Sequence, residues 1–289
     1  MAIDKAYSSS TASGPPSPAG EGRKKEIIMS LNEKKINSLL GDLSKDLQLL
    51  VYKTIDSTNT AAKRLGDSKL CKRAVLIAGE QTAGRGRLGR SFVSEGGKGL
   101  YLSILLGEEL PAEFATSLTT YMAVIASRVI DSLSGLKVDI KWVNDIYSGG
   151  KKLAGILTDG KASDDGHSLS YAVIGIGINL LSQDFPDEIK SIATTVEDEC
   201  GKKIDINELS ALLVKEFFDN LHLVGTGELA DEYRSRSFVI GKRVTVIKPT
   251  STYEATVNAI TNKCELVLIL DNGKTEILST GEVSVRTKT

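Results

Sequence analysis

Glycine and arginine alternate in the stretch Glu80-Gln81-Thr82-Ala83-Gly84-Arg85-Gly86-Arg87-Leu88-Gly89-Arg90. An apolar run, Ala74 to Ala78, leads into this stretch, and a second apolar run, Leu100 to Leu106, follows it. Glycine lets the backbone approach a ligand closely, and arginine offers a planar fork of donors that suits carboxylate and phosphate. Between two strands, the pattern predicts a movable loop that clamps an anion.

The segment Gly84 to Gly89 also matches G-x-G-x-x-G, which has other meanings. A dinucleotide-binding loop needs a helix directly after the glycines, whereas Ser91 to Lys98 has no helical period. A kinase loop needs V-A-I-K, H-R-D and D-F-G elements, and a Walker A loop must end in G-K-[ST]; neither condition is met here. Taken alone, the loop could still be a basic surface loop.

The composition limits the classes of function. The chain has 289 residues, of which 41% are hydrophobic and 25% charged, a balance typical of globular domains. Its 36 Lys and Arg against 37 Asp and Glu lack the basic excess of nucleic-acid-binding proteins. No apolar run approaches the roughly 20 residues that span a bilayer. Cys71, Cys200 and Cys264 form no disulfide framework, and two histidines, His167 and His222, argue against a histidine-rich metal site.

We divide the chain into three parts. Residues 1–45 begin with a segment rich in serine and proline and are expected to form a disordered or irregular tail, with a short helix or irregular lead-in over 31–47. This tail is too short for a winged-helix domain and has no secretory signal, so we expect a cytoplasmic protein and leave organelle targeting open. Residues 46–236 form the main domain, and residues 237–289 form a small one.

The main domain alternates strands and helices. Apolar spacing predicts strands at 47–55, 74–79, 100–106, 138–142, 152–157 and 171–179, and helices at 58–65, 111–133, 205–224 and 228–236. Gly155, Gly175 and Gly177 interrupt two of these strands, and such glycines often mark the close approach of a ligand. In residues 237–289, short strands and the turn Asp271-Asn272-Gly273 predict a small barrel.

Five motifs occur in an order that is more specific than any one of them. They are Ser57-Thr58-Asn59, Gly84 to Gly89, Lys141-Trp142-Val143-Asn144-Asp145, Lys152 to Leu157, and Gly175 to Asn179. Together, from Leu49 to Arg286, they resemble the biotin protein ligases, which include the biotin-[acetyl-CoA-carboxylase] ligases and holocarboxylase synthetases. The family usually has proline at the position of Val143 and often tryptophan at that of Phe92.

The resemblance implies an α+β fold. Its catalytic domain has a central mixed sheet of the class II synthetase type packed with helices, followed by an SH3-like β-barrel. The short N-terminal part implies the monofunctional type, which lacks an N-terminal DNA-binding domain.

The implied activity is a ligase reaction in two steps. Biotin and ATP give biotinyl-5'-AMP and diphosphate, and biotin then passes to one lysine of a biotin carboxyl carrier domain of a carboxylase. No covalent enzyme intermediate is needed. Mg²⁺ would bind through the ATP phosphates rather than through protein side chains alone. We expect no sequence-specific nucleic acid and no membrane as partners, and leave homodimerisation open.

The resemblance also assigns site residues. The biotin-binding residues are Ser57, Thr58, Asn59, Gln81, Gly84, Arg85, Gly86, Arg87, Lys152, Gly155 and Gly175. The residues for ATP and the adenylate are Arg85, Arg87, Phe92, Lys141, Asn144, Lys152 and Asn179. Lys152, Arg87 and Asp145 are the catalytic residues.

Two other functions remain open at this point. A lipoate or octanoyl ligase shares the fold but lacks this pairing of loop and K-W-x-N-D motif. A biotin-sensing DNA-binding repressor would need a winged helix, for which the residues before the first strand are too few.

Overall fold

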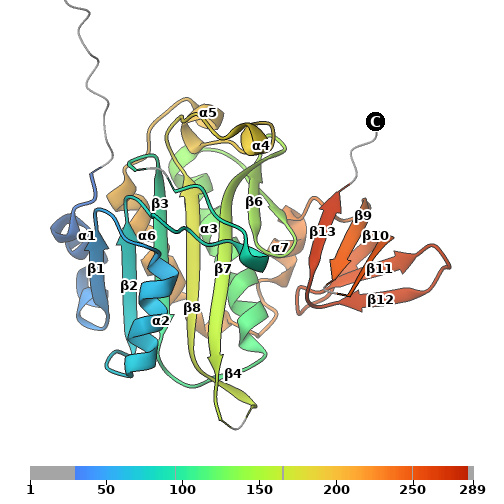
Figure 1. Cartoon of the computed structure of the whole chain (residues 1–289), viewed down its shortest axis with the longest axis horizontal. Coiled ribbons are helices and arrows are strands. Elements are labelled where there is room, and N and C mark those ends of the chain that lie inside the picture. Colours follow the sequence, from blue (N-terminus) through green and yellow to red (C-terminus); the bar gives the residue numbers. More distant parts are fainter. Residues whose placement is uncertain (1–29, 95, 165, 249, 286–289) are drawn as a thin grey trace, which may run out of the picture.

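The computed structural model describes residues 30–94, 96–164, 166–248 and 250–285. It has an α+β fold with two sheets (Figure 1). The large sheet runs in the order β1-β2-β3-β8-β7-β6-β5, and β4 pairs with β8. Its strands are β1 (Gln48–Tyr52), β2 (Arg73–Ala78), β3 (Gly99–Leu106), β4 (Leu110–Pro111), β5 (Asp139–Lys141), β6 (Asp145–Ser148), β7 (Lys151–Ala162) and β8 (Ser168–Asn179). β1 and β2 are parallel and the other pairs antiparallel, so the expected mixed sheet is confirmed.

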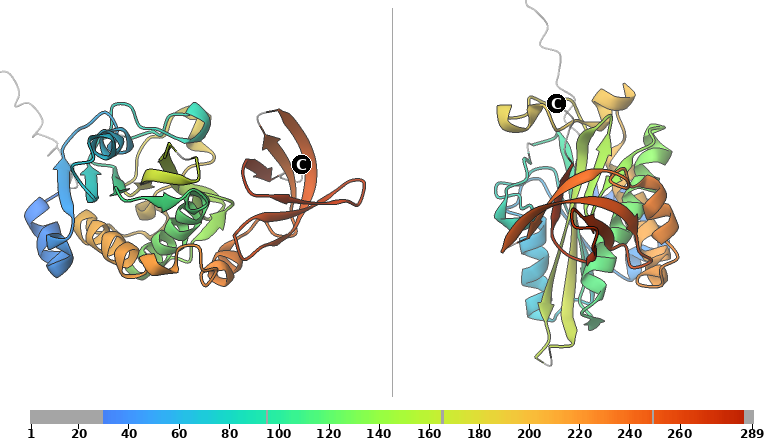
Figure 2. Two further views of the ribbon diagram at one scale, coloured as in Figure 1. Left: turned by 90° about the horizontal axis from the view of Figure 1, so that it is seen from below. Right: turned by 90° about the vertical axis from the view of Figure 1, so that its right-hand side faces the viewer.

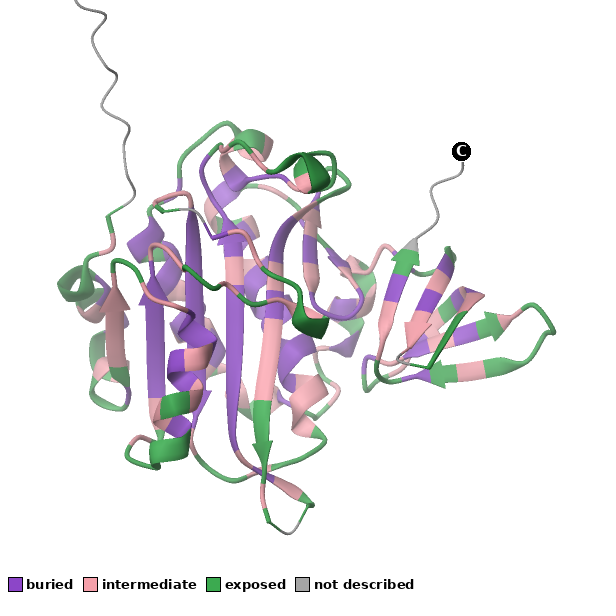
Figure 3. Ribbon diagram, in the orientation of Figure 1, coloured by how far each residue is buried: buried purple, intermediate pink, exposed green. Residues whose placement is uncertain are grey.

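Helices cover both faces of this sheet. α2 (Thr58–Ser68) lies on one face, and α3 (Phe114–Ser134) and α6 (Ile206–Asp219) lie on the other (Figure 2). Alternate residues of β2 serve the two faces, because side chains alternate along a strand. Val75 joins the core under α3, and Leu76 joins a smaller core under α2. As a result, β2, β3 and β8 are buried along most of their length (Figure 3).

Some elements differ from the sequence-based expectation. α3 begins only at Phe114, because Pro111 belongs to β4 and pairs there with Ser168 of β8. α2 continues through Gly66, where a Cβ would lie 2.7 Å from the ring of Tyr171, so glycine allows close packing rather than a stop. β6 was not expected, and neither were the short helices α4 (Asp187–Lys190) and α5 (Val196–Cys200).

The N-terminal part is more ordered than an irregular tail. Residues 33–40 form α1 (Glu33–Leu40), followed by a short turn of helix, Gly41–Lys45. Ile36 and Leu40, four residues apart on one helix face, are buried in the main core. This helix packs on α6, and it lies within the short helix or irregular lead-in expected over 31–47. The part of the expected tail at residues 1–29 lies outside the described residues.

The second sheet is formed by the C-terminal residues. It contains β9 (Arg243–Lys248), β10 (Ser251–Ile260), β11 (Leu266–Leu270), β12 (Thr275–Leu278) and β13 (Glu282–Val285), in the order β12-β11-β10-β9-β13. All its pairs are antiparallel, and the sheet is strongly curved (Figure 2). α7 (Ala230–Arg236) leads into it from the main domain. Within the described residues, no helix is long and apolar enough to cross a membrane.

Candidate active site

The first part of the site is the start of α2. Ser57 caps the helix, and its Oγ accepts a hydrogen bond from the backbone N–H of Thr60 at 3.4 Å. Thr58 donates from its N–H and its Oγ1 to Gln81 Oε1, at 2.8 and 3.1 Å. Gln81 in turn donates from Nε2 to Ser94 Oγ at 3.2 Å. The helix start is therefore fixed to the segment on each side of the glycine-arginine loop.

Asn59 holds the middle of the sheet against α2. Its Oδ1 accepts from Ser103 Oγ at 2.6 Å, and its Nδ2 donates to the carbonyl of Leu157 at 3.1 Å. A Cβ on Gly175 would lie only 1.9 Å from Asn59 Oδ1. Glycine is thus required at position 175 for the amide to reach the sheet. Asn59 also lies 3.4 Å from Asp159 Oδ2.

These residues enclose a small cavity on the sheet, which we call the sheet cavity. It is lined by Ser57, Thr58, Asn59, Gln81, Arg85, Phe92, Gly155, Leu157, Gly175, Ile176 and Gly177. Its volume is only about 30 Å³. The reason is the ring of Phe92, which lies 2.7 Å from a Cβ placed on Gly177 and 3.4 Å from one on Gly155. The glycines make room for a planar group against the strands, and Phe92 now fills part of that room.

The glycine-arginine loop is a compact turn rather than the start of a helix. Its backbone bonds join Gly86 N–H to the carbonyl of Arg90 at 2.7 Å and Phe92 N–H to the carbonyl of Gly84 at 3.0 Å. A Cβ on Gly84 would lie 2.4 Å from the Phe92 carbonyl oxygen, so the two arms approach closely. Three residues at the tip, Arg87–Gly89, form a single 3-10 turn.

The arginines of the loop point to different partners. Arg85 lies 3.5 Å from Asp159, beside the sheet cavity. Arg87 donates to Asn144 Oδ1 at 3.0 Å and to the carbonyl of Gly281 at 2.8 Å. Arg90 pairs with Glu282 at 2.7 Å. The loop therefore joins the main domain to the C-terminal domain.

A second cavity of about 190 Å³ lies under the loop, between the two domains. We call it the charged cavity. It is lined by Arg87, Arg90, Lys141, Trp142, Asn144, Asp145, Ile247, Glu282, Val283 and Ser284. Burial lowers the pKa of Lys141; the charge of Asp145 opposes this change, and the charge of Lys152 adds to it. Arg87, Arg90 and Lys141 line this cavity together with two carboxylates, Asp145 and Glu282, and Lys152 pairs with Asp145 beside it. The excess of cations favours an anionic ligand.

Lys152 lies between the two cavities. Its Nζ is 2.7 Å from Asp145 Oδ1, which belongs to the charged cavity, and 3.2 Å from a Cβ placed on Gly155 in the sheet cavity. The contact with Asp145 is an ion pair whose angles do not make a hydrogen bond. Lys152 can therefore reach a ligand group that passes from one cavity to the other.

Most of the residues expected at the site line the two cavities or lie beside them. Asn179 lines neither cavity, because its Nδ2 donates to the carbonyl of Thr194 at 3.1 Å. Gly84 and Gly86 contribute backbone to the loop rather than a cavity wall. The cis peptide bond between Trp142 and Val143 lies at the position where proline is usual in the resembling family.

Sequence reasoning missed several contacting residues. Ser103 and Asp159 lie in strands where a single polar residue gives little signal. Gly281 and Glu282 belong to the C-terminal sheet, so their contact with the loop depends on how the domains pack. Within the described part of the chain, no three His, Cys, Asp or Glu side chains are grouped to hold a metal ion.

Comparison with known proteins agrees with this arrangement. Residues 51–179 match the biotin/lipoate A/B protein ligase family, and residues 239–286 match the biotin protein ligase C terminal domain. The bifunctional ligase/repressor BirA of Bacillus subtilis is 39% identical over 159 residues, which cover 54% of this chain and 48% of that protein. The biotin--[acetyl-CoA-carboxylase] ligase of Mycobacterium tuberculosis is 30% identical over 227 residues, covering 76% of this chain and 82% of the relative.

A solved structure has the same architecture. Biotin protein ligase from Aquifex aeolicus, in complex with biotin and ATP, superposes with a TM-score of 0.70 at 29% identity, covering 83% of this chain and 99% of that one. The fold is thus that of the biotin and lipoate protein ligases. Since both domains and the mycobacterial relative match, the chain belongs to the biotin protein ligase family. The match spans about half the length of the Bacillus relatives.

Proposed function

We propose that the chain is a biotin protein ligase that attaches biotin to a carrier lysine at the expense of ATP. Two similar proteins support this proposal. The mycobacterial relative is named a biotin--[acetyl-CoA-carboxylase] ligase, and the structure from Aquifex aeolicus holds biotin and ATP. The carrier would be a biotin carboxyl carrier domain, and the compartment the cytoplasm.

The position of Lys152 is the observation on which the proposal depends most. Carboxylate activation requires two anionic groups, a carboxylate and the ATP α-phosphate, to meet at one point. A cation at the junction of a sheet cavity and a charged cavity suits that requirement, because it offsets the repulsion between them. Arg87 supplies a second cation above the same region.

The first step forms the adenylate. A biotin carboxylate oxygen attacks the α-phosphorus, and the bond from that phosphorus to the diphosphate oxygen breaks. The chain supplies positioning and charge rather than a nucleophile. Mg²⁺ would enter with the ATP phosphates and neutralise part of their charge.

The sheet cavity would take the biotin end. Ser57, Thr58 and Asn59 would face the polar edge of the bicyclic ring, with Gln81 beside them. Gly155 and Gly175 leave the strands open to that ring. Phe92 would have to leave its present place over Gly155, and in doing so it would become available to the nucleotide. Arg85 and Arg87 would then close over biotin and the adenylate phosphate.

The charged cavity would take the nucleotide. Lys141 and Asn144 line it, and Asn144 is held by Arg87 and by its own donation to the carbonyl of Ile156 at 2.8 Å. Asn179 would act from outside this cavity, through the segment at Thr194 that it holds.

The second step transfers biotin to the carrier. The lysine amine attacks the acyl carbon of the adenylate, the acyl–phosphate oxygen bond breaks, and AMP leaves. Asp145 is the carboxylate nearest this point, and its Oδ1 lies 2.7 Å from Lys152 Nζ. It would attract the incoming ammonium and take up its proton.

Experiments can distinguish this function from two alternatives, a lipoate or octanoyl ligase and a DNA-binding repressor, and can determine the oligomeric state. A lipoate or octanoyl ligase of the same fold would accept those acids in place of biotin. A repressor would bind operator DNA tightly at physiological salt in an electrophoretic assay, which we expect this chain not to do. Sedimentation with and without biotin and ATP would determine whether it forms a homodimer.

The decisive test is a single incubation. Purified protein, biotin, MgATP and a purified carrier domain should give diphosphate release and the mass increase of one biotinyl group. Octanoate or lipoate in place of biotin should give neither. Absence of both signals with biotin would refute the proposed function.

A further inference from the structure

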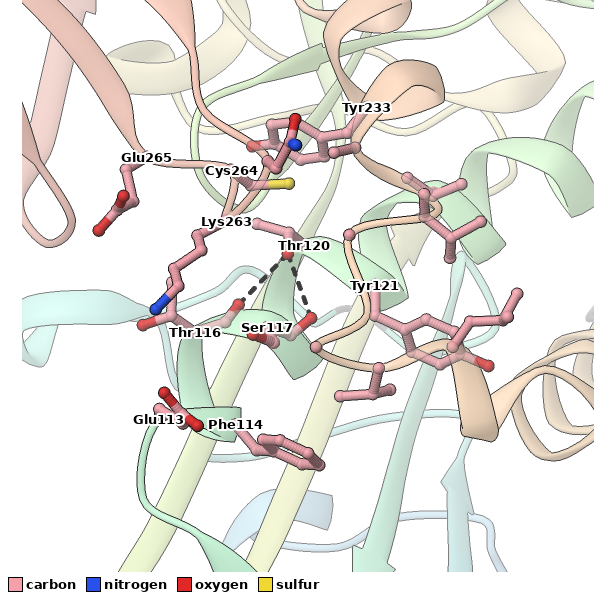
Figure 4. A pocket seen from close by; sticks show the side chains of 18 of the residues that line it. Glu113, Phe114, Thr116, Ser117, Thr120, Tyr121, Tyr233, Lys263, Cys264 and Glu265 are labelled. Carbon is pink, nitrogen blue, oxygen red and sulfur yellow. Dashed lines mark hydrogen bonds between the residues drawn. The ribbon is translucent and has the colours of Figure 1, made fainter.

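A third cavity, of about 350 Å³, shares no lining residue with the other two. Its walls are the first half of α3, the segment 223–233 and two turns of the C-terminal sheet, 262–265 and 279–280 (Figure 4). Small-molecule sites commonly have about 300–1,000 Å³ and often occur where domains meet. We call this space the rear cavity.

The walls of the rear cavity are amphipathic. Phe114 and Tyr121 provide aromatic surface, and Thr116, Ser117 and Thr120 provide hydroxyls from successive turns of one helix (Figure 4). Thr120 uses its proton within the helix, donating to the carbonyl of Ser117 at 3.1 Å. A ligand with an apolar body and one hydrogen-bonding group would match both surfaces.

The charges around the rear cavity exclude one class of ligand. One cation, Lys263, and two carboxylates, Glu113 and Glu265, line the cavity, so its net charge is negative. A phosphate or carboxylate would meet net repulsion there, in contrast to the charged cavity. An uncharged ligand is the better match.

Two residues of the rear cavity hold the strand end that carries part of the active site. Tyr233 Oη donates to the carbonyl of Val143 at 3.1 Å, and the carbonyl of Cys264 accepts from Trp142 Nε1 at 2.8 Å. Tyr233 and Trp142 are both buried, so these bonds are shielded from water. A ligand that moves either wall residue would change the position of the neighbouring Asn144 and Asp145.

We propose that the rear cavity is a second binding site, for a small uncharged molecule with an aromatic or branched apolar body and a hydroxyl or amide group, and that its occupancy changes nucleotide binding at the charged cavity. The first part is independent of the proposed function. The second part rests on ATP being the ligand of the charged cavity.

Ligand-observed NMR with the full chain tests the first part, using 2-phenylethanol as the uncharged probe and benzoate as the anionic one. The alcohol should bind the parent at least fivefold more tightly than benzoate. Ser117→Phe fills the cavity from α3, and Ser279→Trp fills it from the opposite wall; each should weaken binding of the alcohol at least fivefold. Ser132→Phe, an exposed serine on the same helix outside the cavity, is the matched control and should bind like the parent.

No binding of the alcohol, or equal binding by both filled variants and the parent, would overturn the proposal. This measurement uses neither ATP nor biotin, so its failure is distinct from failure of the proposed function. For the second part, ATP is titrated by calorimetry with and without saturating 2-phenylethanol. With 2-phenylethanol present, the dissociation constant of ATP should change at least twofold in the parent and in Ser132→Phe but not in Ser117→Phe. An unchanged constant in the parent would refute the proposed coupling between the two cavities.

Discussion

The sheet cavity and the charged cavity are built from different materials. The sheet cavity lies within one domain, and its shape is set by three strand glycines and by the buried amide of Asn59. The charged cavity lies between two domains, and partly exposed cations and carboxylates surround it. The first can therefore select a ligand by shape and hydrogen bonds, and the second by charge.

This difference determines how each cavity should respond to change. A steric change at the sheet cavity cannot be relieved, since backbone and buried side chains surround it. The energetic effect of changing one charge at the charged cavity is reduced by water and by neighbouring charges. Lys152, which lies between the two cavities, should be the most sensitive position.

Loss of Lys152 should have the largest effect. Lys152→Ala removes the cation where the two ligands would meet, and we expect adenylation to fall by about 10²–10³-fold, as for other preorganised charge stabilisers. Diphosphate release under saturating biotin and ATP measures it. Lys151→Ala, the exposed lysine next to it, is the control and should stay near the parent rate. If the two variants had equal rates, the junction role of Lys152 would be wrong.

Adding a methyl group at Gly175 should have the second-largest effect. Gly175→Ala places a Cβ 1.9 Å from Asn59 Oδ1, and overpacking of this kind costs about 1–3 kcal/mol. Biotin affinity should fall about 10- to 100-fold by calorimetry, with ATP affinity changed far less. Gly160→Ala is a matched strand glycine whose Cβ meets mainly the flexible end of Leu169. Normal biotin affinity in Gly175→Ala would contradict the shape-based account.

The loop arginine should have a smaller effect, with a different signature. Arg87→Gly removes the bonds to Asn144 and Gly281, so the loop loses its hold on the C-terminal domain. Transfer to the carrier should fall about tenfold, the amount of one or two charged hydrogen bonds. Free adenylate should appear in solution, measured by chromatography against diphosphate. Leu88→Gly, at the exposed tip of the loop, should retain its adenylate. Parent-like retention and transfer in Arg87→Gly would refute the clamp.

The smallest effect should be on stability and its pH dependence. Burial lowers the pKa of Lys141 below 10.5, so between the lowered value and 10.5 the unfolded chain binds more protons than the folded one. Stability from this group therefore rises with pH across that window, and the cost of the buried cation is fully present below it. Lys141→Met should be the more stable protein at pH 7.

Urea midpoints at pH 7 and pH 10 measure this difference, which should narrow at the higher pH. Lys137→Met, at an exposed position on the same segment, provides the control. A difference that widens with pH would contradict the sign worked out above.

The sequence predicted most helices and strands well, because the spacing of apolar residues reports directly on burial. α3 and α6 follow from a three-to-four residue period, and β3 from a continuous apolar run. β6 was not predicted, because its polar and apolar residues alternate over only four positions and Asn144-Asp145 resembles a turn. α1 was underestimated, since Ile36 and Leu40 are a short signal in a polar segment.

The candidate site was predictable where its residues sit in local motifs. Ser57, Thr58 and Asn59 could be assigned because they form one of the local motifs that carry the family resemblance. Ser103 and Asp159 could not, because their importance arises from cross-strand distance alone. The same holds for Glu282, whose contact with Arg90 exists only once two domains have packed.

The internal bonds of the glycine-arginine turn have a consequence for conformational entropy. A loop ordered residue by residue would lose about 1–2 kcal/mol for each residue fixed. Here the segment between Gly84 and Phe92 is tied by its own backbone bonds. Fixing the two ends of this turn is therefore enough to hold the whole loop in place, and most of the entropic cost of ordering it is met in folding.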